Sequence, residues 1–237
     1  MNSRSLPRRN SLSSVRSRLS SEKKDLFPVF LKLDQQRCLV VGAGKTAEEK
    51  IPTLLACGAR VSVVAPLATA AIKNWARAGK LGWMQRIFEP EDLNDAFLCV
   101  VATPTKVVNR AVFQEAQRRG ILCNVVHDGA NCNFYYPAVV RRGPLQIAVS
   151  TAGHSGALAQ RLRQELETQF GPEWATWLRW LGEARSSLYD DPLSPRQRRT
   201  LLHKLAGKKK QEEFFRRWGA ASESQTTKRQ QPRERRT

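Results

Sequence analysis

Three small residues that follow an apolar run have the spacing of a phosphate-binding turn. Gly42, Gly44 and Ala47 come after residues 38–41, which have the composition of a short buried strand. In a G-x-G-x-x-A turn the first glycine allows a tight turn, and the second lets the backbone approach a phosphate. The small third residue lets a helix pack closely on the strand. The free N–H groups of a helix that begins near Lys45 would then bind an anion.

This motif alone does not separate a dinucleotide site from an ordinary strand–turn–helix in which the glycines serve geometry only. The context favours a dinucleotide, because a strand-like run at residues 61–65 follows at the spacing of a βαβ unit. Further strand-like runs at 82–87, 96–102 and 121–126 alternate with helix-like segments. The alternation predicts an α/β fold with a doubly wound parallel sheet of the Rossmann type.

Ligands bind at the carboxyl ends of the strands in such a sheet. This rule places several predicted site residues around one crevice: Gly42, Gly44, Ala102, Thr103 and the residues directly after Val126. An apolar segment at 27–33 precedes the first strand, and because it contains Pro28 we predict an edge strand or a cover there.

The pattern changes after residue 126. Two strands are predicted at 134–140 and 145–150, and the short connection between them suits a hairpin rather than a crossover helix. The rest of the chain reads as helical, and its tryptophans are more typical of a core or a partner interface than of a cofactor site. Five regions are predicted: a basic disordered tail (1–24), a dinucleotide-binding Rossmann domain (25–128), a dimerisation region (129–153), a helical domain (154–218) and a second basic disordered tail (219–237).

The net charge of +19 is concentrated at the two ends of the chain. Residues 1–24 carry a net charge of +6, and residues 196–237 carry +10. Solvated ends explain this distribution, and non-specific contact with nucleic acid or attraction of a polyanionic small molecule are the functional alternatives. Nucleic acid is the less favoured partner, because the sequence contains no known nucleic-acid motif and does not interleave aromatic with basic residues.

The cysteines and the hydropathy narrow the class of protein further. Five scattered cysteines without a C-x-x-C pair suggest neither a zinc site nor a disulfide framework, so we expect no bound metal. Free buried thiols are typical of a reducing compartment, which predicts a cytoplasmic location. No apolar run approaches the length of a membrane span, and we expect no membrane partner.

Several stretches together match one family. The most specific are Asn-Val-Val-His-Asp at 124–128, Cys-Asn-Phe at 132–134, the run at 137–145 that contains Arg141 and Arg142, and the run at 147–153 that ends in Ser-Thr-Ala-Gly. With the glycine turn and residues 58–66, they show that the chain resembles the precorrin-2 dehydrogenase/sirohydrochlorin ferrochelatase module of siroheme synthases. The resemblance covers roughly residues 26–215.

The resemblance implies a reaction and an architecture. Precorrin-2, a tetrapyrrole with eight carboxylates, would lose a hydride to NAD and become sirohydrochlorin. Some members then insert Fe²⁺, which would be a second substrate here. A Rossmann domain, a dimerisation region and a small helical domain are implied, and with them a homodimer. The methyltransferase domain fused to some siroheme synthases is not expected in this chain.

The resemblance also implies the residues that bind the ligands. The cofactor would contact Gly42, Ala43, Gly44, Lys45, Thr46, Ala47, Ala65, Pro66, Ala102, Thr103 and Asn124. The carboxylates of the substrate would contact Arg141, Arg142, Ser150 and Thr151, although a solvated turn is an equal explanation for the two arginines. No acidic residue follows Val64 to hold a ribose, so NAD rather than NADP is taken from the resemblance.

His127 departs from the family pattern, in which an acidic residue follows Asn-Val-Val and is regarded as catalytic. Three interpretations remain open. His127 is structural, or its imidazole is the general base, since an imidazole with an ordinary pKa of about 6.5 is mostly neutral near pH 7. Alternatively, the neighbouring Asp128 is the base. Adjacent residues of a strand face opposite ways, which counts against Asp128 unless the strand has already ended.

Two other classes of function compete with the enzyme. The first is a catalytically inactive Rossmann-type protein that binds a tetrapyrrole or a dinucleotide. The second is a nucleic-acid-binding protein that acts through its basic ends. Formation of NADH from precorrin-2 and NAD would separate the enzyme from the inactive binder. Binding of DNA that survives deletion of both tails would support the second class.

Overall fold

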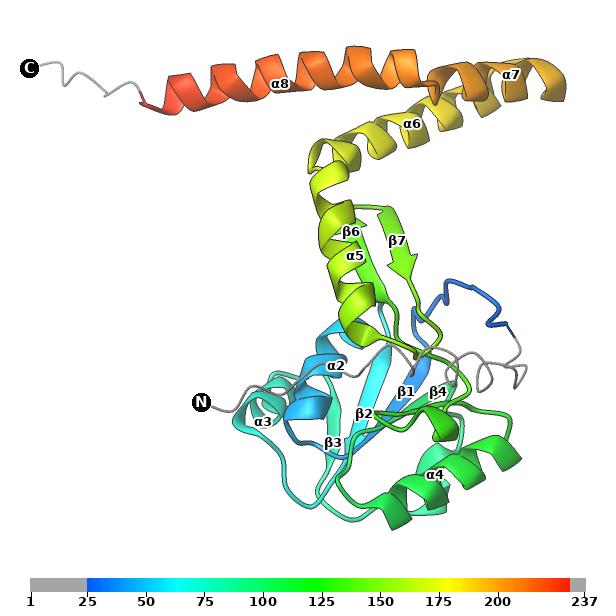
Figure 1. The fold of residues 1–237 in the computed structure, drawn as a ribbon, viewed down its shortest axis with the longest axis vertical. Helices are drawn as coiled ribbons and strands as arrows, with labels where there is room; N and C mark the ends of the chain where they lie inside the picture. Colours follow the sequence, from blue (N-terminus) through cyan, green and yellow to red (C-terminus); the bar gives the residue numbers. More distant parts are fainter. Residues whose placement is uncertain (1–24, 231–237) are drawn as a thin grey trace, which may run out of the picture. The chain divides into compact units, whose positions relative to one another are not determined.

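The computed structural model describes residues 25–230, and beyond residue 219 it describes the backbone alone. The chain forms two compact units, of which the first ends at Phe134 and the second starts at Tyr135 (Figure 1). The predictions made for residues 1–24 and 231–237 lie outside the described residues.

The first unit is built on a five-stranded parallel sheet with the order β3-β2-β1-β4-β5. Its strands are β1 (Arg37–Val41), β2 (Arg60–Val64), β3 (Gly82–Met84), β4 (Leu98–Val101) and β5 (Leu122–Val125). The chain starts in the middle of the sheet, adds strands toward one edge, and then returns to add strands toward the other. The predicted doubly wound sheet is therefore confirmed, and the order reverses between β1 and β4.

The strand sequences explain why these segments form the centre of the sheet. β4 is buried throughout, and β1 is buried from Cys38 onward. Strands of a parallel sheet are covered on both faces, so they read as continuous apolar runs rather than alternating ones. Parallel pairing aligns Val41 with Val64 on one side and with Val101 on the other, so three strands end at one level.

Helices cover this sheet. The first unit contains α2 (Lys45–Ala56), α3 (Ala70–Arg77) and α4 (Lys106–Arg118), and two short 3₁₀ helices, η1 (Pro90–Leu93) and η2 (Gly129–Asn131). Helix α2 packs on β1 and β2, and α4 packs on β4 and β5. The buried residues of α2 are Ala47, Ile51 and Leu54, which share one face because their spacing follows the helical repeat.

The prediction for residues 27–33 is wrong. The segment forms no strand among the described residues, and it covers nothing, because Phe27 is 87% exposed and Phe30 is 68% exposed. Only Leu33, at its end, is buried. Pro28 lacks a backbone donor, and the edges of the observed sheet are β3 and β5, so the segment has no place in the ladder.

The second unit begins with the predicted hairpin. Strands β6 (Ala138–Arg142) and β7 (Leu145–Val149) pair antiparallel, with Arg142 opposite Leu145. The loop is therefore only two residues long, Gly143 and Pro144. Gly143 has a φ of +56°, which a two-residue hairpin loop requires at its first position when the second is proline.

Four helices follow: α5 (Gly156–Gln169), α6 (Glu173–Asp190), α7 (Pro195–Leu205) and α8 (Lys208–Gln230). The Ser155 hydroxyl accepts a hydrogen bond from Leu158 N at 3.1 Å and thereby caps the N-terminus of α5. The backbone of α8 extends well past Trp218, where the sequence predicted the end of the helical region. No described helix is both long enough and apolar enough to cross a membrane.

Trp177 and Trp180 of α6 belong to an aromatic cluster of the second unit. Trp177 is 4% exposed and stacks on Trp180, with the ring centroids 5.0 Å apart. Phe214 of α8 packs against both rings, at 5.0 and 5.9 Å. This cluster joins α6 to α8 and accounts for aromatic side chains that do not occupy a cofactor site.

Candidate dinucleotide and catalytic site

The glycine turn lies at the point where the order of the strands reverses. Gly42 has a φ of +99°, and its N–H donates to Val64 O of the neighbouring strand at 2.9 Å. A Cβ at this position would lie only 2.6 Å from Ala102 O, which is a backbone atom and cannot move aside cheaply. Gly42 therefore allows the turn to pass between the ends of β2 and β4.

Gly44 has a different environment, which suits a bound anion. It is the N-cap of α2, with a φ of −83° and no side chain to cap the helix, and an added Cβ would meet no atom within 4 Å. The first turn of α2 therefore has N–H groups that no side chain caps. Ala47 is fully buried where the helix packs on the sheet, so all three small residues occupy the positions that the motif requires.

Charged side chains stand beside this turn. Lys45 Nζ lies 3.1 Å from Glu48 Oε1, so the lysine is already paired. Hydrogen bonds from Thr69 and then from Lys45 keep the pKa of Glu48 below its ordinary value. Thr46 is half-buried in the same turn of helix, and Ala43 is buried and accepts a hydrogen bond from Thr69 N at 3.1 Å. The loop after β2 is thereby joined to the glycine turn.

The end of β2 presents Ala65 and Pro66 beside the turn. Ala65 N donates to Met84 O at 3.2 Å, and Ala65 O accepts from Trp83 Nε1 at 3.0 Å. These bonds fix the backbone that would pass the adenosine half of a dinucleotide. The strand end carries no carboxylate for a ribose, as the sequence indicates.

Asn109 fixes the end of β4, and the sequence reasoning missed it. Its Oδ1 accepts from Thr103 Oγ1 at 2.6 Å, and its Nδ2 donates to Thr103 O at 3.1 Å. Asn109 is only 8% exposed. Ala102 and Thr103 are thus held between Gly42 on one side and Asn109 on the other. An asparagine on the apolar face of a predicted helix was the available signal.

The end of β5 forms a tight turn at His127. Asp128 N donates to Val125 O at 3.1 Å, so residues 125–128 form a β-turn, and His127 has a φ of +65°. A positive φ at the third position matches a type II turn, where a non-glycine residue is uncommon. Strained residues of this kind cluster at functional sites. The imidazole is exposed.

Asp128 lies just outside the strand, because β5 ends at Val125. The objection based on alternating strand residues therefore does not apply to it. Asp128 is half-buried, and its Oδ2 accepts a hydrogen bond from Asn131 Nδ2 at 2.8 Å. Asn124 is turned elsewhere: its Nδ2 donates to Phe134 O at 2.8 Å, which ties β5 to the segment that follows η2.

The predicted substrate-binding residues belong to the second unit. Arg142 has its guanidinium engaged, with Nε donating to Phe170 O at 2.7 Å and Nη2 to Glu167 O at 3.1 Å. It stabilises the last turn of α5, and Arg141 is the exposed arginine of the two. Thr151 exchanges two hydrogen bonds with the backbone of Ser155, and Ser150 Oγ accepts from Ala152 N at 3.2 Å.

Cys38 and Cys99 are buried thiols of the first unit and are not reactive near neutral pH. Burial raises the pKa of Cys38 to about 11. A hydrogen bond with Cys123, followed by burial, raises the pKa of Cys99. Neither thiol would be a nucleophile near neutral pH. Within residues 25–230 no group of three or more His, Cys, Asp or Glu side chains could hold a metal ion.

Comparisons with known proteins identify relatives of this chain. Residues 29–138 match a family described as putative NAD(P)-binding, and residues 142–169 match the central region of sirohaem biosynthesis proteins. The chain is 37% identical over 176 residues to a siroheme synthase of Photorhabdus laumondii, which covers 74% of this chain and 37% of that protein. A siroheme synthase of Methylococcus capsulatus is 38% identical over 175 residues, with the same coverage. The chain thus spans little more than a third of these curated relatives.

A solved structure resembles the chain over about four fifths of the chain's length. The structure is titled "SirC, precorrin-2 dehydrogenase". It is 30% identical in sequence, and the TM-score is 0.67. The match covers 81% of this chain and 98% of that one.

Proposed function

The chain belongs to the family of the siroheme synthases and the precorrin-2 dehydrogenase SirC, and we propose that it oxidises precorrin-2 to sirohydrochlorin with NAD. The observation that carries the proposal is the glycine turn at the switch point of the sheet. It presents uncapped helix N–H groups and a position, Gly44, where no side chain intrudes. A pyrophosphate fits such a place because backbone donors and the helix dipole both favour negative charge.

Different residues of the first unit would bind the cofactor and accept the proton in a dehydrogenase reaction. When bound, NAD accepts a hydride from the substrate. Gly42 and Gly44 would hold the pyrophosphate, and Ala102 and Thr103, at the end of β4 beside Gly42, would form the backbone surface next to it. Each two-electron oxidation also releases a proton, which a base near the ring must accept.

We place that base at the turn after β5, at the carboxyl end of the sheet. His127 is exposed there, and its backbone has the φ of +65° that is uncommon for a residue other than glycine. Asp128 is the alternative base, since its carboxylate lies beyond the strand and is oriented by Asn131. The two assignments predict different variants to be inactive.

The decisive experiment follows NADH absorbance after precorrin-2 and NAD are mixed with the purified chain. We expect turnover in the parent and a loss of about 100-fold or more in His127→Ala, the usual effect of removing a general base. His127→Asp should retain much of the activity and shift the pH optimum downward. Parental rates in both variants would remove His127 as the base, and Asp128→Asn would then identify its replacement. No turnover in the parent, despite bound NAD, would leave an inactive binder.

A ferrochelatase step is a separate question, with Fe²⁺ as a substrate. The imidazole of His127, in place of a carboxylate, changes how the site receives iron and the pyrrole protons. We therefore propose that the chain is a dehydrogenase without ferrochelatase activity. Siroheme formation from sirohydrochlorin and Fe²⁺ should proceed no faster with the protein than without it. A protein-dependent rate would establish the second activity.

We further propose a homodimer. The side chains of Leu26, Phe27, Val29, Phe30 and Leu31 are 40–87% exposed. Exposed apolar patches of this kind mark interaction surfaces, and a two-stranded hairpin such as β6–β7 is marginal by itself. The hairpin and the helices beyond it, roughly residues 130–155 and onward, are the expected interface. Light scattering at micromolar concentration should give twice the mass of the chain, and a monomer would exclude this assembly.

A further inference from the structure

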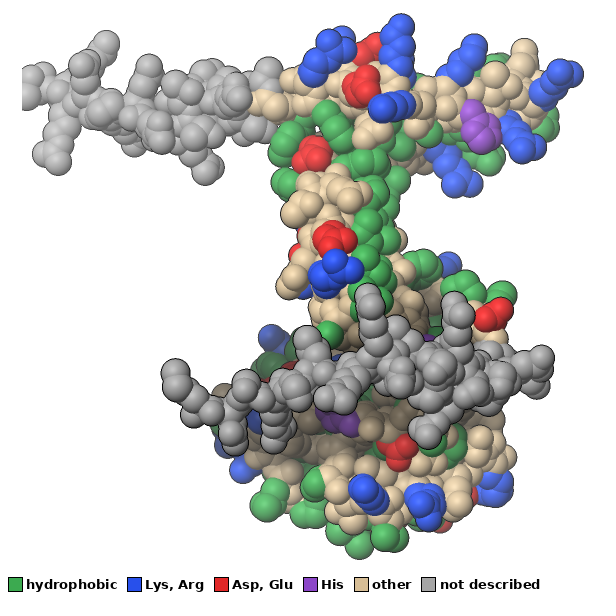
Figure 2. Space-filling model, viewed as in Figure 1, with side chains coloured by type: hydrophobic (Ala, Val, Ile, Leu, Met, Phe, Trp, Pro, Cys, Tyr) green, Lys and Arg blue, Asp and Glu red, His purple; other side chains and the backbone are tan. Residues whose placement is uncertain are grey.

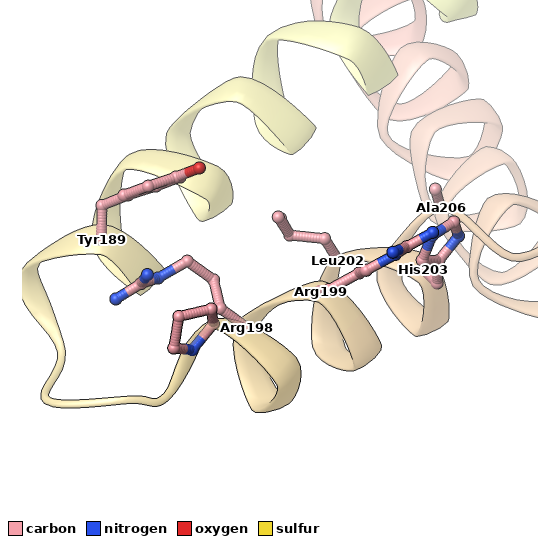
Figure 3. Close-up of a pocket in the computed structure, with 7 residues that line it drawn as sticks. Tyr189, Arg198, Arg199, Leu202, His203 and Ala206 are labelled. Carbon is pink, nitrogen blue, oxygen red and sulfur yellow. The ribbon is translucent and has the colours of Figure 1, made fainter.

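A cavity of about 430 Å³ lies in the second unit, where the end of α6 faces α7 (Figure 3). Its wall combines cationic, aromatic and aliphatic side chains: Tyr189, Pro195, Arg198, Arg199, Leu202 and His203. None of these residues takes part in the site described above. Figure 2 shows Lys and Arg side chains gathered along the helices of this unit.

Arg198 and Tyr189 form the fixed end of the cavity. Arg198 Nε donates to Leu188 O at 2.8 Å, and its Nη2 donates to Leu193 O at 3.2 Å. The guanidinium also lies 4.5 Å from the centroid of the Tyr189 ring. The guanidinium of Arg198 therefore stabilises the connection between α6 and α7. Arg198 shapes the cavity and is not the group that binds a ligand.

Arg199 and His203 are the groups free to bind. They stand one turn apart on α7 and therefore share one face of the helix. Both are exposed, and neither makes a hydrogen bond or ion pair with another described residue. Helix α7 contains no Asp or Glu among Pro195–Leu205, so nothing in it neutralises these donors. Leu202 supplies an apolar surface between them and α6.

We propose that this cavity binds the carboxylate-bearing edge of a planar polycarboxylate, namely the tetrapyrrole that the enzyme uses or makes. The proposal rests on the proposed function for the identity of the ligand class. Two adjacent donors suit neighbouring carboxylates, and the apolar wall suits the ring that carries them. The cavity would bind one edge of the macrocycle. It would thus be a second binding site, separate from the site where the tetrapyrrole is oxidised.

A nucleic acid fits the same residues less well. Single-stranded nucleic acid is held by bases that stack on aromatic rings, in addition to contacts with phosphates. Tyr189 is the aromatic residue in the cavity wall, and the guanidiniums of Arg198 and Arg185 already lie over its ring, at 4.5 and 5.7 Å. The available features are therefore cations and an aliphatic surface.

The test uses uroporphyrin, which has eight carboxylates and cannot be dehydrogenated by this reaction. The full-length chain is titrated with it, and binding is followed by porphyrin fluorescence. Arg199→Gln combined with His203→Gln should weaken the binding of one equivalent per chain about tenfold or more. Arg196→Gln is the matched control, because it removes a charge from the same helix at a residue that does not line the cavity. We expect it to bind uroporphyrin within about twofold of the parent.

Three outcomes would overturn the site: unchanged binding in the double variant, an equal loss in Arg196→Gln, or displacement of uroporphyrin by single-stranded DNA at matched charge. The equal loss would reveal diffuse attraction by the basic helices. Failure of the dehydrogenase is distinguishable from these results. A chain that forms no NADH but binds uroporphyrin through Arg199 and His203 would refute the enzyme and retain the site.

Discussion

Replacing Gly44 by Asp should weaken NAD binding roughly 100-fold and leave the protein folded. The environment of Gly44 explains why the variant should stay folded. The position has a φ of −83°, which any residue adopts, and a Cβ there meets nothing within 4 Å. An aspartate is also a good N-cap, and the difference from glycine is only a few tenths of a kcal/mol. Thermal unfolding should therefore match the parent or rise slightly.

The loss of affinity follows from charge. The aspartate would put a negative charge where the pyrophosphate sits, and two unit charges about 4 Å apart repel by about 4 kcal/mol at an effective dielectric constant of 20. Exposure and salt reduce this figure. We expect about 2.7 kcal/mol to remain, a loss of roughly 100-fold in affinity. Titration calorimetry with NAD at fixed ionic strength measures it.

Two further variants separate the effect of charge on NAD affinity from the effect of an added Cβ. Gly44→Ala adds a Cβ without charge, so any loss of NAD affinity in it reports how closely the backbone approaches the phosphate. Gly42→Ala should instead destabilise the fold by about 1–3 kcal/mol, because its φ is +99° and Ala102 O lies 2.6 Å from the new Cβ. A folded Gly44→Asp protein with parental affinity for NAD would refute the assignment of the turn.

Other residues give separate expectations. Asn109→Ala leaves the Thr103 carbonyl without its donor, so the dissociation constant for NAD should rise about tenfold, roughly 1–2 kcal/mol, while the KM for precorrin-2 stays constant. Burial opposes ionisation of Asp92, but hydrogen bonds from Arg86 and the backbone outweigh it and lower its pKa. Asp92→Asn should therefore cost about 1–2 kcal/mol of stability at pH 7. The difference from the parent should begin to shrink as the pH falls below about 4 and should be lost as the pH falls through the lowered pKa of Asp92. Cys38, whose pKa is about 11, should resist alkylation at pH 8 in the folded protein and react in urea; rapid labelling without urea would contradict its burial.

Much of the first unit was predictable from the sequence because its signals are local. Buried parallel strands read as apolar runs, and the G-x-G-x-x-A spacing marks a backbone geometry that side chains would block. Gly42 and Ala47 occupy the positions expected of them. The hairpin was predictable for a similar reason, since Gly143 and Pro144 leave no room for a crossover.

The details of the site depended on partners that lie far apart in the sequence. Arg142 resembles a ligand-binding arginine by its position, yet its guanidinium is bonded to Phe170 O, 28 residues away. Residues 27–33 looked like a strand or cover until the sheet was complete without them. The pattern of residues predicted the strand before His127 and named both His127 and Asp128 as candidate bases, whereas the turn at 125–128 set the φ of His127 and removed the objection to Asp128. Composition and periodicity record burial along the chain; a side chain's hydrogen-bond partner is settled when separate elements pack together.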